Sequence, residues 1–330
     1  MEERYNKLSN FLKEKFGEKV LKICIDGGFT CPNRDGRVSY GGCIFCSEKG
    51  SGEHLSSNEN ISKQVNDFFN SYKAERANKF IVYFQNFSNT YDTVENLKKK
   101  YDAALINDRI VGLAVATRPD CINEEIVQLL KEYSKKYYVW VELGLQTSNE
   151  KTGKFINRGY DNKTFLNAVS LLRNYGIDVV VHIMVGLPNE DFEDLKNTIK
   201  FINSIDVQGI KIHSTYVIEG TYLAKMYENG EYTPLTYDQY MDYLCYIITH
   251  LRPDIVIHRI SGDAPKELLI APSWDIHKKW VMNGLFKRMN AEDLWQGGIR
   301  GRSLKSLLLG IEGRTFKQKR DIFYIKMSLI

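Results

Sequence analysis

Three cysteines, Cys31, Cys43 and Cys46, lie within one short segment of the chain, residues 31–46. Thiolates bind zinc and iron–sulfur clusters, and paired thiols carry out redox chemistry. Three thiolates can hold three irons of a [4Fe–4S] cluster, so that the fourth iron has no protein ligand. Such an iron is of no use for simple electron transfer, but it can bind a substrate or a cofactor. The spacing therefore indicates a metal site that acts on a bound molecule.

Two other interpretations of this segment stay open. His54 follows Cys46 by eight residues and would complete a Cys3His zinc site. Cys43 and Cys46 would also form a redox dithiol, but such pairs normally open a helix, whereas this one follows Gly41 and Gly42. The local pattern favours the cluster over zinc, and zinc over the dithiol.

The other three cysteines, Cys24, Cys121 and Cys245, stand singly in or next to apolar segments, and we expect them to be small buried hydrophobic residues. Six cysteines without a secretory signal predict a reducing compartment, the cytoplasm. No run of 18 uncharged apolar residues occurs, so no membrane span is expected. The formal net charge of +4 permits nucleic-acid binding without demanding it.

The elements that must position these residues follow a repeated strand–helix pattern. Runs rich in β-branched and aromatic residues predict strands at 20–26, 79–84, 110–117, 137–145, 177–185 and 207–214. Amphipathic segments predict helices at 59–75, 94–105, 123–136, 162–176 and 191–205. Several strands are nearly continuous apolar runs, as in parallel sheets covered on both faces. Six such units predict one α/β domain, a barrel or partial barrel, with no boundary before about residue 215.

Short polar segments follow the predicted strands, at 85–91, 117–120, 146–150 and 186–191. Ligands of parallel α/β folds bind where the strands end, at their carboxyl edge. Segment 31–46 follows the first strand, so we expect the three thiols to face the mouth of the barrel.

The order of these features resembles the radical S-adenosylmethionine (SAM) superfamily. The resemblance rests on a cysteine at the first strand's end, a Cys-x-aromatic-Cys pair and a following strand–helix series. The family's commonest spacing is C-x3-C-x2-C, and C-x11-C-x2-C is a departure from it. The long gap, with CPNRDG and GGCxFC, resembles short bacterial relatives of the Elongator catalytic subunit, over roughly residues 15–298.

The resemblance implies a partial (βα)6 TIM-like barrel over 1–215. Segment 216–298 would complete the same domain as a C-terminal extension, and 299–330 would form a basic tail. It also implies two cofactors, a [4Fe–4S] cluster held by Cys31, Cys43 and Cys46, and SAM bound at the open iron. One electron, from a donor such as flavodoxin or ferredoxin, would cleave SAM to methionine and a 5′-deoxyadenosyl radical.

The same resemblance implies SAM contacts. Gln146, in a GLQ segment, would contact the ribose, and Arg158, in an NRG segment, would pair with the methionine carboxylate. Gly186 and Leu187, in a GLP segment, would pass close to the adenine, and Phe45 would lie against it. Without the resemblance, an ordinary surface arginine would be the better interpretation of Arg158.

Three positions depart from the family pattern. His182 stands where relatives carry an aspartate, so it is either a ribose contact or a core histidine. The segment after the second strand lacks the usual glycines, so Gln85 or its neighbours would receive the methionine amino group. The third strand ends without the usual glutamate, and Glu142 is either a cofactor ligand or a core-edge carboxylate with a partner.

The relatives imply tRNA as substrate, at the 5-substituent of the wobble uridine. Segment 46–53 resembles a branch of the aminomethyluridine pathway, which would convert carboxymethylaminomethyl to aminomethyl. The alternatives are a radical enzyme acting on a small metabolite or protein, and a non-catalytic zinc- or RNA-binding protein.

Side chains after the barrel would stack on a flipped base and meet phosphates: Tyr216, Arg259, Trp274, Lys278 and Lys279. Packing in the core is the competing role for the aromatic ones. The tail 299–330 carries eight Lys or Arg residues against two acids, Glu312 and Asp321, and is a candidate RNA contact.

Overall fold

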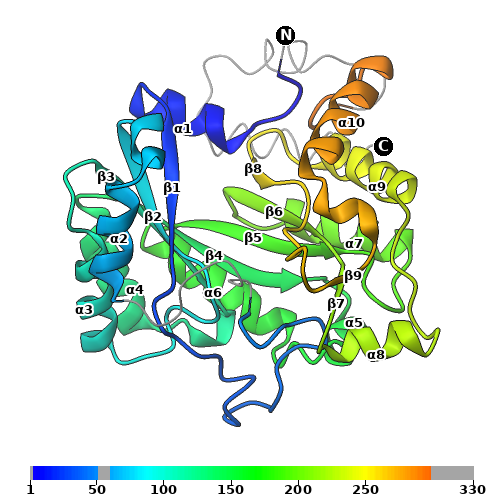
Figure 1. Cartoon of the computed structure of the whole chain (residues 1–330), viewed down its shortest axis with the longest axis horizontal. Helices are drawn as coiled ribbons and strands as arrows, with labels where there is room; N and C mark the ends of the chain where they lie inside the picture. The colour runs from blue at the N-terminus through cyan, green and yellow to red at the C-terminus, as the bar shows by residue number, and fades with distance from the viewer. Residues whose placement is uncertain (1–2, 51–59, 299–330) are drawn as a thin grey trace.

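A computed structural model of the chain describes residues 3–50 and 60–298. Its centre is a parallel sheet with the strand order β1-β2-β3-β4-β5-β6-β8, which curls into a partial barrel (Figure 1). The strands are β1 Val20–Ile25, β2 Lys79–Phe84, β3 Ile110–Thr117, β4 Tyr138–Gln146, β5 Asp178–Val185, β6 Gly209–Ser214 and β8 Val256–Arg259. A separate antiparallel pair joins β7 Val217–Ile218 to β9 Leu269–Ala271.

Helices cover the outer face of this sheet. They are α1 Leu8–Phe16, α2 Ile61–Phe69, α3 Val94–Ala104, α4 Glu124–Ser134, α5 Glu150–Phe155, α6 Asn162–Asn174, α7 Phe192–Asn203, α8 Tyr222–Glu228, α9 Tyr237–His250 and α10 Lys278–Ala291. Short 3-10 turns occur at Tyr72–Arg76, Pro119–Cys121 and Ser273–Ile276. Side chains cap the first turns of eight of these helices, at Asn60, Thr93, Asn123, Asn149, Asp161, Asp191, Thr221 and Thr236. These caps satisfy amide groups that a helix start leaves unpaired.

The sheet is apolar on both faces, which is why its strands read as continuous apolar runs. Residues such as Phe80, Val82 and Phe84 face the helices and belong to the largest buried cluster. Ile81 and Trp140 face the barrel interior, which we call the lumen, and belong to a second buried cluster. The lumen is therefore a packed core near the amino ends of the strands.

Helix α1 covers the amino end of the lumen. Its side chains Leu8, Phe11, Leu12 and Phe16 belong to or pack on the lumen cluster. Just before the helix, the Ile257 N–H of β8 donates a hydrogen bond of 2.7 Å to the Asn6 carbonyl. The segment thus bridges the two edge strands, β8 and β1. Figure 1 shows α1 and the loop after β1 at opposite ends of β1.

The predicted fold class is confirmed, and the six predicted strands correspond to β1–β6. The seventh strand, β8, was missed because it has four residues and ends in His258 and Arg259. The division at residues 215 and 298 stays a prediction. The tail 299–330 and His54 lie outside the described residues.

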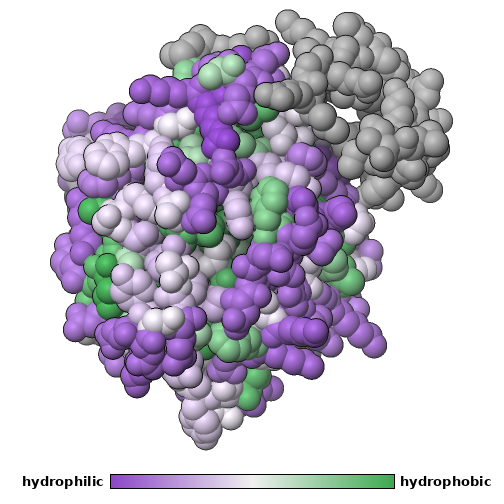
Figure 2. Space-filling model, turned by 90° about the vertical axis from the view of Figure 1, so that its right-hand side faces the viewer, coloured by the Kyte–Doolittle hydropathy of each residue, from purple (hydrophilic) through white to green (hydrophobic). Residues whose placement is uncertain are grey.

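Two properties of the exterior limit what the chain contacts. Figure 2 shows a mostly hydrophilic face, on which hydrophobic side chains occur in small separate spots. Across residues 3–50 and 60–298, no helix has the length and apolar character needed to cross a membrane.

Candidate cluster and cofactor site

The loop that carries the three cysteines, residues 26–50, is here called the cluster loop. Asp26 anchors its start, because its N–H donates to Gln64 Oε1 (3.0 Å) and its carbonyl accepts from Gln64 Nε2 (2.8 Å). The Asp26 carboxylate accepts from the Gly28 N–H at 2.8 Å and from Asn86 Nδ2 at 2.9 Å. The loop is therefore fixed to both α2 and the segment after β2 before the first cysteine.

The structure brings Cys31, Cys43 and Cys46 together at the carboxyl edge of the sheet. Burial, together with the neighbouring Cys46 and Cys31, raises the pKa of the Cys43 thiol to about 12, against the opposing effect of Arg118. A thiol with a raised pKa stays protonated until a metal takes the place of the proton. Within the described part of the chain, no three Cys, His, Asp or Glu side chains are gathered as around a single ion. The binding of a cluster by these three thiols stays a prediction, which the chemistry of three neighbouring thiols supports.

Two asparagines brace the cluster loop against the segment after α5. Asn157 Nδ2 donates to the Gly42 carbonyl at 2.8 Å and to Ser39 Oγ at 3.1 Å. Asn33 Nδ2 donates to the Asn157 carbonyl at 2.6 Å and approaches Cys43 Sγ at 3.7 Å. Donors beside a ligating sulfur tune the metal that it binds. Sequence reasoning missed both asparagines.

Arg158 has a different role from the one that the resemblance implied. Its side chain is 1% exposed, and all five of its N–H groups are used within the protein. The acceptors are the carbonyls of Leu145, Thr147 and Tyr160, Glu150 Oε2 and Asn162 Oδ1. No donor is left for the methionine carboxylate. Arg158 instead ties the end of β4 to the starts of α5 and α6, and we call Asn33, Asn157 and Arg158 together the brace.

Arg118, just after the end of β3, is the cation that lowers the pKa of the Cys43 thiol. It holds Asp120 with two hydrogen bonds of 2.9 and 2.8 Å and donates to the Arg158 carbonyl at 3.0 Å. Gly159 permits this close packing: its φ is +80°, and a Cβ there would lie 2.7 Å from Asn33 Oδ1. The sequence offered only the polar segment 117–120 as a sign of this group.

The middle of the Cys-x-x-Cys segment joins distant elements. The Ile44 N–H donates to the Ile156 carbonyl at 3.2 Å, and the Ile44 carbonyl accepts from the Leu223 N–H at 2.9 Å. Ile44 shares a buried apolar cluster with Leu187, and Phe45 packs against it. The structure thus places Phe45 and Leu187 on one apolar surface. Their contact with adenine stays a prediction.

Gln85, Gln146 and Gly186 lie at the carboxyl edge of the sheet, as expected. Gln146 ends β4 with φ +65°, and Gly186 follows β5 with φ +85°, where a Cβ would lie 2.8 Å from Leu235 Cγ. Gln85 follows β2 and donates its backbone N–H to the Ile25 carbonyl at 3.4 Å. Their contacts with a cofactor stay predictions.

Beyond Gln85, two buried amide oxygens suit the cofactor's amino group. Asn86 Oδ1 and Asn89 Oδ1 have no hydrogen-bond partner among the described residues. Their Nδ2 atoms are occupied by Asp26 and by the carbonyls of Phe84 and Ala116. Buried acceptors without donors are rare unless a ligand or water pairs with them. The residues after β2 therefore fit an ammonium group.

Glu142 lies inside the lumen as a fully partnered carboxylate. Oε1 accepts from Trp140 Nε1 at 2.9 Å, and Oε2 lies 2.8 Å from His182 Nε2 and pairs with Lys211. Lys211 Nζ also donates to the Tyr83 hydroxyl at 2.7 Å. Of the two roles left open for Glu142, the structure matches the core carboxylate with a partner, and His182 belongs to the same network.

The electrostatics of this network follow from its burial. Lys211 and His182 hold the pKa of Glu142 well below its usual value against desolvation. Burial lowers the pKa of Lys211 to about 7 and that of His182 to about 4, although Glu142 opposes both shifts. His182 is therefore unprotonated near neutral pH, and Lys211 loses its proton more readily than an exposed lysine does.

The predicted RNA contacts take different positions. Trp274 packs with its ring centroid 4.9 Å from that of Tyr240 and donates Nε1–H to the Leu235 carbonyl, which is the core role. Lys278 and Lys279 are exposed, and Tyr216 is half-buried.

Arg259 belongs to β8, and its Nη2 lies 3.7 Å from Asp263 Oδ2. Lys278 pairs with the other carboxylate oxygen of Asp263, and Tyr216 lies against the neighbouring Gly262. Three of the five predicted RNA-contact side chains thus lie around Asp263, and their contact with RNA stays a prediction.

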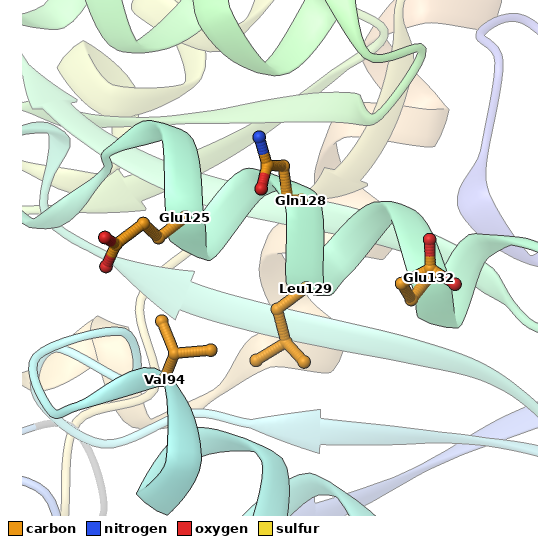
Figure 3. Close-up of a pocket in the computed structure, with 5 residues that line it drawn as sticks. All are labelled: Val94, Glu125, Gln128, Leu129 and Glu132. Carbon is orange, nitrogen blue, oxygen red and sulfur yellow. The ribbon is translucent and has the colours of Figure 1, made fainter.

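A groove on the exterior is separate from this site. It lies between α3 and α4 and is lined by Val94, Glu125, Gln128, Leu129 and Glu132 (Figure 3). Both of its charged side chains are acidic. It therefore offers no cation for a phosphate or carboxylate.

Comparisons with known proteins agree with this arrangement. Residues 31–202 match the model of the Radical SAM superfamily, and residues 207–291 match the Radical_SAM C-terminal domain. The protein YtqA of Bacillus subtilis is 42% identical over 298 residues, which cover 90% of this chain and 92% of that protein.

Two more distant similarities concern a tRNA uridine(34) acetyltransferase and an archaeal Elp3. The tRNA uridine(34) acetyltransferase of Methanocaldococcus jannaschii is 32% identical over 166 residues, covering 49% of this chain and 30% of that protein. The structure of Methanocaldococcus infernus Elp3 superposes with a TM-score of 0.65 at 20% identity, covering 86% of this chain and 65% of that one. The second similarity concerns the fold. From the match over 31–202, the partial barrel and the three gathered thiols, we conclude that the chain belongs to the radical SAM superfamily.

Proposed function

We propose that this radical SAM enzyme acts on transfer RNA and converts the carboxymethylaminomethyl group on C5 of the wobble uridine to aminomethyl. The methylene between nitrogen and carboxylate would lose a hydrogen atom and one further electron, with SAM as the net oxidant, and water would then cleave the C–N bond, so that the two-carbon unit leaves as glyoxylate. The observation that carries the proposal is the likeness to a protein whose name gives uridine 34 of tRNA as its target. Position 34 is the wobble position. The likeness covers 49% of this chain and 30% of that protein, so the reaction itself is our proposal.

Membership of the superfamily gives the chain a [4Fe–4S] cluster and SAM. When bound, they supply a 5′-deoxyadenosyl radical, a reagent strong enough for an unactivated C–H bond next to nitrogen. Cys31, Cys43 and Cys46 would hold the cluster, and the residues after β2 would hold the amino group of SAM. The brace keeps the cluster loop in place, and α1 closes the amino end of the lumen against water.

Two further parts of the proposal follow from the chemistry. The cluster needs an external electron to start the reaction, which a flavodoxin or ferredoxin would supply. Transfer RNA would reach the enzyme in the cytoplasm. Family membership counts against the non-catalytic zinc-binding alternative.

The test is mass spectrometry of tRNA nucleosides from a strain that lacks the gene. We expect carboxymethylaminomethyluridines to accumulate and aminomethyl derivatives to disappear. The wild-type gene should restore the profile and the Cys43→Ala variant should not. Cys245→Ala is the matched control, because Cys245 lies on α9 outside the site. An unchanged wobble profile in the deletion strain would contradict the proposal.

A reconstituted reaction separates the remaining alternative. Enzyme loaded with iron and sulfide without oxygen, supplied with SAM and a reductant, should convert tRNA from the deletion strain. Turnover of a small metabolite or protein without any tRNA would instead favour the second interpretation of the sequence.

A further inference from the structure

The lumen between β5, β6 and β8 carries several basic side chains. In register, His182 lies beside Lys211, and Lys211 lies beside Arg259. A bulge between β6 and β8 skips His258, so His258 and Arg259 both belong to this region, and the Trp140 ring lies 5.5 Å from that of His258. We call Lys211, His213, His258 and Arg259 the basic cluster.

Near neutral pH the positive charge of the basic cluster comes from Lys211 and Arg259, because burial lowers the pKa of His213 and His258 well below the usual value. Glu142 is the acid that faces the basic cluster from β4, and its oxygens are used by Trp140, His182 and Lys211. At the rim, Asp263 pairs with Lys278, and Asp275 bonds to Ser214. Apart from burial, Arg259 is the largest influence that lowers the pKa of His213. A region of this kind attracts an anion.

Arg259 differs from the other buried arginines in what its guanidinium does. Arg158 and Arg118 donate all or most of their N–H groups to protein oxygens. The Arg259 side chain is 27% exposed, and to the residues that the structure describes it makes one ionic contact, to Asp263 at 3.7 Å. That distance is too long for a hydrogen bond. The planar fork of Arg259 is therefore open to a ligand.

Polar atoms without partners lie on and just after β6, the strand that pairs with β8. His213 Nε2 and Thr215 Oγ1, at and just beyond the end of β6, are buried and have no hydrogen-bond partner in the described chain. The ring of His213 lies 5.3 Å from that of His182. Both atoms can donate a hydrogen bond in the right tautomer or rotamer. Together with the open fork, they form a set of donors that lacks an acceptor.

We propose that Arg259, with His213 and Thr215, binds the carboxylate of the carboxymethylamino group of the substrate. The inference rests on the proposed function and names the part of the same site that recognises the substituent. A carboxylate matches a guanidinium fork with two parallel hydrogen bonds. The aminomethyl product keeps the amine that the substrate also carries but has lost the carboxylate, so it offers Arg259 no anionic partner. The same residues would therefore favour the substrate and release the product.

SAM also carries a carboxylate, and the experiment must distinguish the two sources. The variant is Arg259→Gln, assayed with tRNA that carries carboxymethylaminomethyluridine. We expect kcat/KM to fall on the order of 100-fold, as for the loss of one partner of a desolvated charge pair. SAM cleavage without tRNA should be unchanged. Arg288→Gln is the matched control, because Arg288 is similarly exposed but lies on α10 and pairs with Asp242 and Glu292.

A neutral substrate sharpens the assay. With tRNA whose carboxylate has been converted to a primary amide, the wild type should lose activity by a similar factor. Arg259→Gln should no longer distinguish the acid from the amide. Arg259→Lys, which keeps the charge without the fork, should fall between the two.

Each other outcome identifies what failed. If Arg259→Gln loses tRNA-independent SAM cleavage as well, Arg259 holds the carboxylate of SAM and the inference is overturned. If the wild type converts tRNA and Arg259→Gln converts it equally well, the inference alone is overturned. A wild type that leaves the tRNA unchanged overturns the proposed function and the inference with it.

Discussion

Two regions at the carboxyl edge of the sheet use the same kinds of residue in opposite ways. In the brace, Arg158 is buried and all five of its N–H groups have acceptors. In the basic cluster, Arg259 donates no hydrogen bond to a described residue, and His213 Nε2 is buried without a partner. The brace stabilises a shape, whereas the basic cluster is incomplete until a ligand arrives. An arginine's partners, rather than its burial, tell the two roles apart.

The difference has an energetic side. A buried donor with its acceptor contributes to stability, and a buried polar atom without one costs about 1–3 kcal/mol. The brace should therefore dominate the stability of this edge, and the basic cluster should dominate its response to ligands and pH. Four experiments test that separation.

The largest expected effect comes from removing what the brace holds in place. Cys43→Ala should abolish cluster binding and SAM cleavage, because two thiolates cannot retain the cubane in the geometry that SAM needs. Iron and labile-sulfide content, with the yield of 5′-deoxyadenosine, measure this. Cys245→Ala should keep both. Full SAM cleavage by Cys43→Ala would show that the cluster is held elsewhere.

The second experiment compares the two arginines directly. Arg158→Gln should lower the free energy of unfolding by about 3–5 kcal/mol, because it leaves several buried carbonyls and Glu150 without a donor. Arg259→Gln should change it by less than about 1 kcal/mol. Urea unfolding of both variants without cofactors provides the measurement. A stable Arg158→Gln with weakened SAM binding would restore the role that the resemblance implied.

The third effect is a dependence of stability on pH that belongs to the lumen. Burial lowers the pKa of His182 to about 4 and that of His213 and His258 well below the usual value. The unfolded chain takes up protons below about pH 6.5 and the folded chain does not, so this stability is complete above pH 6.5 and lost as the pH falls toward 4.

Urea unfolding between pH 7 and pH 4.5 should show a loss on the order of 1–3 kcal/mol. His213→Asn should make the dependence shallower, and His250→Asn, on α9 outside the lumen, should leave it unchanged. An equal dependence in all three proteins would place its origin outside the basic cluster.

The smallest effect tests how closely the brace packs. Gly159→Ala should destabilise the fold by about 1–2 kcal/mol, since a left-handed φ alone costs about 1 kcal/mol and the new Cβ would also meet Asn33 Oδ1. Gly176→Ala is the matched control: its φ is +74°, and its Cβ would meet nothing closer than Lys131 Nζ at 3.8 Å. Equal losses in the two variants would mean that the close contact does not matter.

The sequence predicted the parts of this molecule that local patterns encode. Strands β1–β6 are continuous apolar runs, and the cysteines of the cluster loop are close neighbours along the chain. The short strand β8 lacks such a run. It is a strand because Lys211 and Arg259 pair across a bulge, which no local pattern reveals.

The missed site residues share one physical reason. Asn33 and Asn157 act through a contact between segments far apart in the sequence. An asparagine in a loop carries no local sequence pattern that would indicate such a contact. For Arg158 the resemblance implied a ligand role that the structure does not support. All five of its N–H donors are used by acceptors within the protein. Which donors are free depends on the folded neighbours, and spacing alone does not give that.

The position of α1 has a consequence for any radical formed above it. Helix α1 closes the amino end of the lumen with the side chains Leu8, Phe11, Leu12 and Phe16. The lumen is therefore open at its carboxyl end and closed at its amino end. Bulk water cannot reach a reactive species from the amino end of the lumen, and a bound molecule cannot leave through that end. A substrate that enters the lumen must leave through the carboxyl edge by which it entered, which makes product release a candidate for the slow step.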